Sequence, residues 1–159
     1  MEIDKNIAKS IKNILNKNKL LTLSTSYKNQ PYSNTAYYTF DRKFNIYIWS
    51  ETKTTHGKNI LKNNRVAVNI FDSRQKWGSL LRGLQATGTV TLIKNNRELI
   101  KAGMLYIKRF PRSLKFVKNP KGFHSKIFES RLYKIKLNKI KAFDEKNFGK
   151  GGFRKIFLT

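Results

Sequence analysis

The stretch "LLTLSTSYKNQPYSNTAYYTFDRKFNIYIWS", Leu20 to Ser50, decides the fold. Its runs "LLTLSTSY", "YSNTAYYTF" and "IYIWS" are rich in β-branched and aromatic residues, which favour strands. The segments "KNQP" and "DRKFN" between them carry turn-forming residues. We therefore predict three consecutive antiparallel strands, a β-meander.

Helical periodicity appears on both sides of this meander. Isoleucines recur at helical spacing through "IDKNIAKSIKNILNKNK", which predicts an amphipathic N-terminal helix within residues 1–18. "GKNILKNN" predicts a two-turn helix with Ile60 and Leu61 facing inward. "NNRELIKAGMLYIKRFP" predicts a longer helix that ends near Phe110, on the spacing of Ile100, Met104 and Ile107.

The remaining strands complete an antiparallel sheet. We predict a strand at "RVAVNIF" and a long bent strand over Leu80 to Ile93, where Gly83 and Gly88 are candidate bulge positions. A final strand pair, "KIFESRLYKIKL" and "IKAFD", precedes a basic glycine-rich tail at residues 146–159. Because closure protects strand edges, we predict that residues 1–159 form one mainly β domain, an antiparallel barrel with flanking helices.

Composition narrows the class of protein. The chain has no cysteine, which excludes a disulfide scaffold, thiolate zinc sites and thiol nucleophiles. No apolar stretch approaches the roughly 20 residues that span a bilayer, and "MEIDKNIAKS" is too charged for a signal peptide. We therefore expect a soluble cytoplasmic protein with no membrane partner.

The net charge of +25 permits two interpretations. It could attract nucleic acid or another polyanion, as the mixture of glycine, aromatic and basic residues in "FGKGGFRKIF" also could. However, the lysines are spread along the whole chain, as compositional bias alone would produce. We do not expect nucleic acid to be the partner, and we retain a polyanion-binding module without catalysis as the alternative function.

The polar connection "ETKTTHGKNI", Glu51 to Ile60, is the candidate site. On the residues alone, Thr54 or Thr55 could cap the following helix with His56 exposed, or the segment could hold a phosphate at a helix N-terminus. We expect no metal site, because His124 is the only other histidine and neither has a carboxylate at ligand spacing. The bulky aromatic side chains are interpreted as core or subunit-interface packing, namely Tyr37, Tyr38, Trp49 and Trp77.

The order of these segments resembles the FMN-binding split-barrel family typified by pyridoxamine 5'-phosphate oxidase. The resemblance covers about Leu20 to Ile93. Within that family the chain is most similar to a small uncharacterised bacterial subgroup, on the motifs "NTAYYTFD", "TKTTHG", "LLRGLQATG", "RFP" and "NFGKGG". The resemblance implies a homodimer with FMN at the subunit interface, and a flavin-dependent oxidoreductase whose small-molecule substrate or electron donor is unidentified. A deazaflavin (F420) or haem in place of FMN stays open.

The resemblance also implies a set of cofactor-binding residues. In this family the connection after the third strand binds the FMN phosphate. The second and third strands contact the isoalloxazine ring, and Gln85 would meet its polar edge. The implied residues are Asn34, Ala36, Tyr37, Ser50, Lys53, Thr54, Thr55, His56, Lys58 and Gln85. Asn34 and Thr39 stand where that oxidase has basic residues for the phosphate, and His56 stands where many members have lysine. The substrate-binding residues of that oxidase are not recognisable in the C-terminal third, so we do not assign vitamin B6 oxidation and name no catalytic residue.

Overall fold

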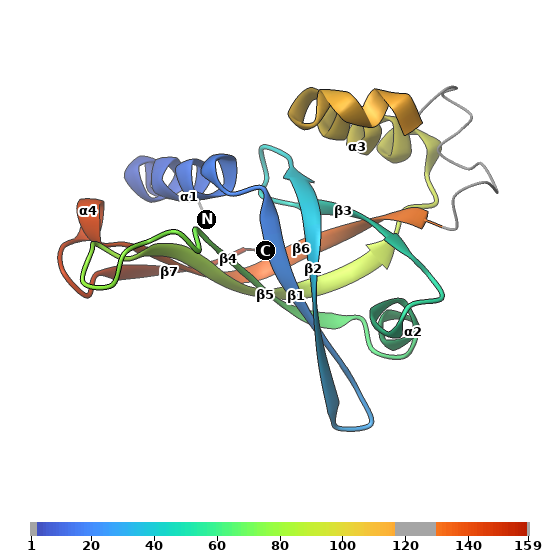
Figure 1. Ribbon diagram of the computed structural model, residues 1–159, viewed down its shortest axis with the longest axis horizontal. Helices are drawn as coiled ribbons and strands as arrows, with labels where there is room; N and C mark the ends of the chain where they lie inside the picture. The colour runs from blue at the N-terminus through green and yellow to red at the C-terminus, as the bar shows by residue number, and fades with distance from the viewer. Residues whose placement is uncertain (1–2, 117–129, 159) are drawn as a thin grey trace.

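The computed structural model describes residues 3–116 and 130–158, and its elements follow the predicted order (Figure 1). The first half contains α1 (Lys5–Lys17), β1 (Leu20–Tyr27), β2 (Gln30–Phe40), β3 (Ile46–Glu51), α2 (Thr55–Lys62) and β4 (Arg65–Phe71). The second half contains β5 (Arg82–Leu92), α3 (Asn96–Arg109), the 3-10 helix η1 (Pro111–Phe116), β6 (Ser130–Asp144), α4 (Glu145–Phe148) and β7 (Phe153–Phe157).

Six strands close into a barrel. The sheet order is β3-β2-β1-β4-β5-β6, every pairing is antiparallel, and β3 also pairs with β6. β7 extends the sheet beyond β6. The prediction of a mainly β split barrel with flanking helices is therefore confirmed.

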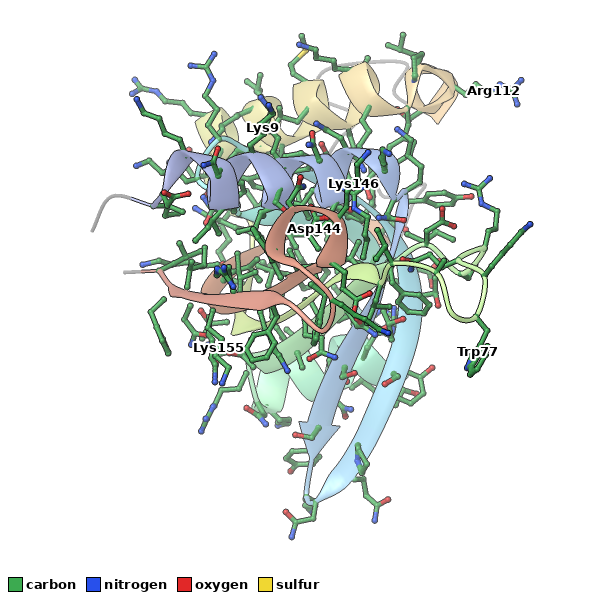
Figure 2. The ribbon with its side chains drawn as sticks, turned by 90° about the vertical axis from the view of Figure 1, so that its left-hand side faces the viewer. Lys9, Trp77, Arg112, Asp144, Lys146 and Lys155 are labelled. Carbon is green, nitrogen blue, oxygen red and sulfur yellow. The ribbon has the colours of Figure 1, made fainter. Side chains whose placement is uncertain are left out.

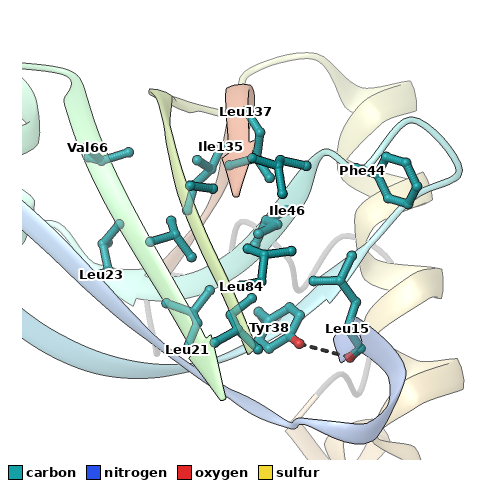
Figure 3. Packing of buried hydrophobic residues seen from close by; sticks show 14 of the residues in the cluster. Leu15, Leu21, Leu23, Tyr38, Phe44, Ile46, Val66, Leu84, Ile135 and Leu137 are labelled. Carbon is teal, nitrogen blue, oxygen red and sulfur yellow. Dashed lines mark hydrogen bonds between the residues drawn. The ribbon is translucent and has the colours of Figure 1, made fainter. Parts of the chain in front are cut away.

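The barrel interior forms the main core (Figure 3). Strand alternation directs one apolar face of each strand inward, as with Val66, Val68 and Ile70 of β4. Helix α1 covers one end of this core with Ile11, Ile14 and Leu15. At the C-terminal end of α1, the Tyr38 hydroxyl donates to the carbonyl oxygen of Leu15 at 2.8 Å (Figure 3).

A buried carboxylate joins α1 to the barrel. Asp144 is fully buried where β6 meets α4 (Figure 2), and it accepts a hydrogen bond from Ser10 of α1 at 2.6 Å. Arg82 of β5 pairs with the same carboxylate at 3.0 Å. Because the charge is both paired and hydrogen-bonded, burial does not leave it uncompensated.

A second, smaller core lies beneath α3. It contains Tyr47, Ile93, Leu99, Ala102, Tyr106 and Leu132. The predicted helix is present, but Ile100 and Met104 are 54% and 62% exposed. Ala102 and Gly103 lie on the buried face instead, and their small size permits close packing of the helix. Leu61 of α2 is likewise exposed, so only Ile60 of that predicted pair faces inward.

The predicted final strand pair is instead one strand, β6, in its described part; residues 126–129 lie outside the described ranges. Asn138, which separates the two predicted strands, is the extra residue of a bulge opposite Thr87 and Gly88. A Cβ on Gly88 would lie 2.4 Å from the Lys136 carbonyl oxygen, so this predicted bulge position requires glycine. The predicted tail is partly ordered as well, because it contains β7.

The large aromatic residues differ in their environments. Tyr38 is a core residue, as interpreted, and Trp49 packs against the second core. Trp77 is fully exposed on the β4–β5 connection and projects from the body of the molecule (Figure 2), so it is not a core residue. No helix in the described ranges has the length and apolarity required to cross a membrane.

Candidate functional site

β2 separates from β3 part-way along its length. The two strands pair only over Tyr38–Phe40 and Ile46–Ile48, whereas β3 continues beside β6 as far as Glu51. The first part of β2 pairs with β1 alone and forms a hairpin that projects beyond the barrel (Figure 1). This divergence is the split of the barrel, and it gives the first part of β2 an edge that β3 does not cover.

Tyr106 of α3 joins the two strands where they diverge. Its hydroxyl donates to the Tyr37 carbonyl oxygen at 2.5 Å and accepts from the Trp49 amide at 3.3 Å. The ring packs edge-on against Trp49, and burial raises the pKa of the Tyr106 hydroxyl above its usual value. A side chain therefore takes the place of a direct strand-to-strand hydrogen bond. The sequence contains no pattern that predicts this bridging role of Tyr106.

Helix α2 begins where β3 ends. Thr54 is the N-cap: its hydroxyl accepts from the Gly57 amide at 3.2 Å and donates to the Glu51 carbonyl oxygen at 2.8 Å. A Cβ on Gly57 would lie only 2.6 and 2.5 Å from the carbonyl oxygens of Glu51 and Thr52. The sequence "TTHG" therefore combines a cap with the close approach of the helix to the preceding turn.

His56 is buried beneath this turn and is not the exposed residue of the capping hypothesis. Its side chain is 7% exposed, its ring stacks on Tyr32 at 6.3 Å between centroids, and Nε2 contacts the Ser50 hydroxyl. Nε2 also lies 3.1 Å from the Thr54 hydroxyl. Burial lowers the pKa of His56 below its usual value, with partial opposition from Glu51, so the imidazole is neutral at pH 7.

The hydrogen-bond network indicates the tautomer of His56. We assign the proton to Nε2, because the Thr54 hydroxyl already donates to Glu51 and the Ser50 hydroxyl can act as the second acceptor. Nδ1 is then an acceptor, and it is buried without a partner among the described residues. The Oδ1 atom of Asn34 is a second buried acceptor of this kind. A bound group that offers hydroxyl or N–H donors would satisfy both.

The structure brings together only part of the predicted residue set. Asn34 and Ala36 pair with the inward-facing Leu23 and Leu21, and thus share the face of β2 on which Tyr32 stacks against His56. Ser50 and Thr54 contact His56, and the same turn and the start of α2 also carry Lys53, Thr55 and Lys58. These last three side chains are exposed.

Tyr37 and Gln85 lie apart from this group. Tyr37 is 60% exposed and packs edge-on against Phe110. Gln85 pairs with Asn69 on the outer face of the sheet, where both line a hollow of about 530 Å³ together with Lys139 and Lys141. Within one chain, Gln85 therefore lies on the opposite side of the sheet from Asn34 and His56.

The described residues contain no cluster of three metal-ligating side chains. His124 lies outside the described ranges. Thr39 is buried and donates to the Leu105 carbonyl oxygen at 3.3 Å, so it contacts α3 and is not available to an anion.

Comparison with known proteins agrees with this architecture. The family model "Pyridoxamine 5'-phosphate oxidase" matches residues 7–142. A UPF0306 protein from Pasteurella multocida is 38% identical over 81 residues, and the match covers 50% of this chain and 54% of that relative. The chain therefore spans about half the length of that relative.

Solved structures show the same fold at low sequence identity. A heme binding protein from Mycobacterium smegmatis superposes with a TM-score of 0.72 at 12% identity, over 99% of this chain and 59% of that one. A Clostridium acetobutylicum protein related to general stress protein 26, of the pyridoxinephosphate oxidase family, superposes with a TM-score of 0.68 at 12% identity. The match covers 98% of this chain and 97% of that one. These likenesses concern the fold alone.

Replacing Tyr106 with Phe tests the bridge across the split. The variant keeps the ring but leaves the Tyr37 carbonyl and the Trp49 amide, both in part-buried contacts, without the hydroxyl. We therefore expect the free energy of unfolding to fall by about 1–3 kcal/mol. Urea unfolding measures the change. Tyr37→Phe is the control, because it removes an exposed hydroxyl from the same contact region; an equal loss in both variants would contradict the bridge.

The lowered pKa of His56 predicts a pH dependence of stability. As pH falls below about 6.5, the unfolded chain gains a proton at His56 before the folded chain does, so the free energy of unfolding decreases. Urea unfolding between pH 5 and 7 measures this slope. His56→Phe keeps an aromatic ring against Tyr32 but cannot titrate, and we expect its slope to be shallower; an unchanged slope would show that other groups cause it.

Proposed function

Since the chain belongs to the pyridoxamine 5'-phosphate oxidase family, we propose that it binds FMN and acts as an oxidoreductase on a small molecule. A bound flavin supplies hydride or single-electron transfer, and the protein supplies its position and its electrostatic surroundings. The observation that carries the proposal is the α2 N-terminus with its neighbouring unpaired acceptors, placed where β2 and β3 diverge.

The phosphate end of the ligand fits the first turn of α2. Thr55 is exposed there, and Lys58 follows it on the same helix. The N-terminal amides and the helix dipole add about 0.3–1 kcal/mol for an anion. Thr54 is already engaged on both sides as the N-cap, so its role is to hold the turn in shape.

The two unpaired acceptors fit a different part of FMN. His56 Nδ1 and Asn34 Oδ1 would repel a phosphate, but they can accept hydrogen bonds from the hydroxyls of a ribityl chain. His56 is thus proposed to position Ser50 and to accept from the ligand while it remains neutral. This differs from the cationic anchor that lysine provides at a phosphate.

Haem is the second candidate cofactor because of the heme-binding neighbour. His56 is the only histidine in the described ranges, and Nε2 is already hydrogen-bonded beneath the turn. The free Nδ1 of His56 could ligate a haem iron as well as accept from a ribityl hydroxyl, so the identity of the cofactor has to be measured. The absorbance spectrum and mass of the cofactor in purified protein distinguish FMN, deazaflavin and haem.

The separation of Gln85 from His56 supports a homodimeric site. A partner subunit that packs on the outer face of one sheet would bring its own side chains to the face that carries Gln85. We propose that each FMN contacts His56 and Thr55 of one subunit and Gln85 of the other. An isologous dimer contains two such sites.

Thr55→Val tests the phosphate contact. Loss of one hydrogen bond to a charged group costs about 1.5–3 kcal/mol, so we expect the Kd for FMN to rise roughly 10- to 100-fold. Quenching of flavin fluorescence on titration measures Kd. Thr91→Val is the matched control, because Thr91 is also exposed but lies on β5; unchanged affinity in Thr55→Val would restrict the segment to helix capping.

A mixing experiment tests whether the site spans two subunits. Thr55→Val and Gln85→Leu are each expected to weaken FMN binding as homodimers. A heterodimer of the two carries both substitutions in one site and neither in the other, so we expect about one tight FMN per heterodimer. If Gln85 served the site of its own chain, both heterodimer sites would remain weak.

A further inference from the structure

A large groove lies between α1, α3 and the turn that joins β2 to β3. Its volume is about 1080 Å³, slightly above the roughly 300–1,000 Å³ range of small-molecule sites. Helices α1 and α3 lie along the upper side of the barrel in Figure 1, whereas α2 lies at the lower right. The groove is therefore separate from the proposed flavin site.

The walls of this groove are strongly basic. Eight of its fifteen lining residues are Lys or Arg, against 34 in the 159 residues of the chain. They are Lys9, Lys12, Lys19, Arg42, Lys43, Lys101, Lys108 and Arg109. This local enrichment is greater than the uniform spread of lysines accounts for.

Two of the eight cations are already engaged. Lys101 pairs with Asp41, the only acidic residue in the lining, at 2.7 Å. Burial alone would raise the pKa of Asp41, but hydrogen bonds from Lys101 and Asn45 lower it to about 2, so the pair is charge-neutral. Arg109 donates to the carbonyl oxygens of Leu15 and Asn18 at the end of α1.

The other six cations form no ion pair with the described residues, and one of them, Lys19, lies 5.9 Å from the centre of the Phe110 ring. Lys9, Lys12 and Lys108 are exposed. The side of α1 that carries Lys9 faces the groove (Figure 2). Lys9, Lys12 and Asn16 line the groove from one side of α1, and the separation of seven residues between Lys9 and Asn16 corresponds to about 10 Å at helical rise. Lys19 continues this wall just beyond the end of the helix. Charge distributed over that length suits several linked anionic groups better than one small ion.

The floor of the groove is apolar. Ala8, Phe40 and Leu105 contribute to it and are partly buried. The Arg109 guanidinium lies 5.4 Å from the centre of the Phe40 ring. An apolar floor between basic walls can receive the flat base of a nucleotide while the rim contacts its phosphates.

We propose that this groove binds linked phosphates carried by a nucleotide. The same linked phosphates occur in the backbone of a nucleic-acid strand, which is the other source of this chemistry. The proposal does not depend on FMN binding, because it uses residues of α1, α3 and the β2–β3 turn only.

The test compares two triple variants of equal net charge in magnesium-free buffer. The groove variant is Lys9→Gln/Lys12→Gln/Lys108→Gln, and the control is Lys76→Gln/Lys94→Gln/Lys136→Gln, whose lysines are exposed and lie outside the groove. Calorimetric titration uses ATP, inorganic tripolyphosphate and a 12-nucleotide oligouridylate. Because all six lysines are exposed, both variants are expected to keep the circular dichroism spectrum of the parent protein.

We expect ATP and tripolyphosphate to bind the parent protein, and the groove variant to bind both at least about tenfold more weakly. The control variant should change affinity less than about twofold. Equal weakening in both variants, or no binding to the parent protein, would overturn the proposal. Thr55→Val should leave ATP binding unchanged, which separates the groove from the flavin site.

The oligonucleotide identifies the source of the phosphates. Binding much tighter than ATP that is lost in the groove variant, with a salt slope of about −0.7 per phosphate contact, would identify a nucleic-acid strand. ATP binding as tight as the oligonucleotide would identify a free nucleotide. Either result supports phosphate binding in the groove.

Discussion

The parting of β2 from β3 is the constraint on which the rest of the molecule depends. One edge of β3 pairs with β6 along its whole length, whereas the other edge pairs with β2 over only three residue pairs. The barrel is therefore closed on one side of β3 and split on the other. The Tyr106 hydroxyl holds both backbones at that point, which fixes α3 on the outer face. The turn after β3 can then enter α2 beside the projecting hairpin, with Asn59 donating to Thr25 at 3.2 Å.

Local sequence patterns were sufficient for most of the elements, because alternation and helical periodicity report which residues are buried within one element. They were insufficient where the surface against which an element packs decides which of its faces is buried. Helix α3 has two candidate apolar faces, and the close fit of Ala102 and Gly103 selects the one without Ile100 and Met104. Asn138 is a residue type that favours turns, yet here it is the extra residue of a bulge inside a continuous strand. Its side-chain oxygen accepts a hydrogen bond from the Thr87 hydroxyl at 2.7 Å.

The candidate site was predictable in location but not in detail. The polar segment before a short helix identified Thr54 as a possible cap, and its hydrogen bonds confirm that role. The role of Thr55 as a phosphate ligand stays a proposal. The burial of His56 depends on Tyr32 and Ser50, which come from two other strands, so no spacing rule could reveal it. Similarly, the basic groove assembles lysines more than ninety residues apart, which a charge count cannot distinguish from a uniform surface.

The length of β6 also affects how the chain reaches this structure. One strand of fifteen residues pairs with β3, β5 and β7, and it follows every element that forms the rest of the barrel. During synthesis, β3 and β5 therefore keep open edges until the ribosome has released residue 144. Closure then requires contacts between distant parts of the chain, which slows folding. In that interval the strand that closes one barrel can also pair with a neighbouring copy, so the final step of folding competes directly with intermolecular strand exchange.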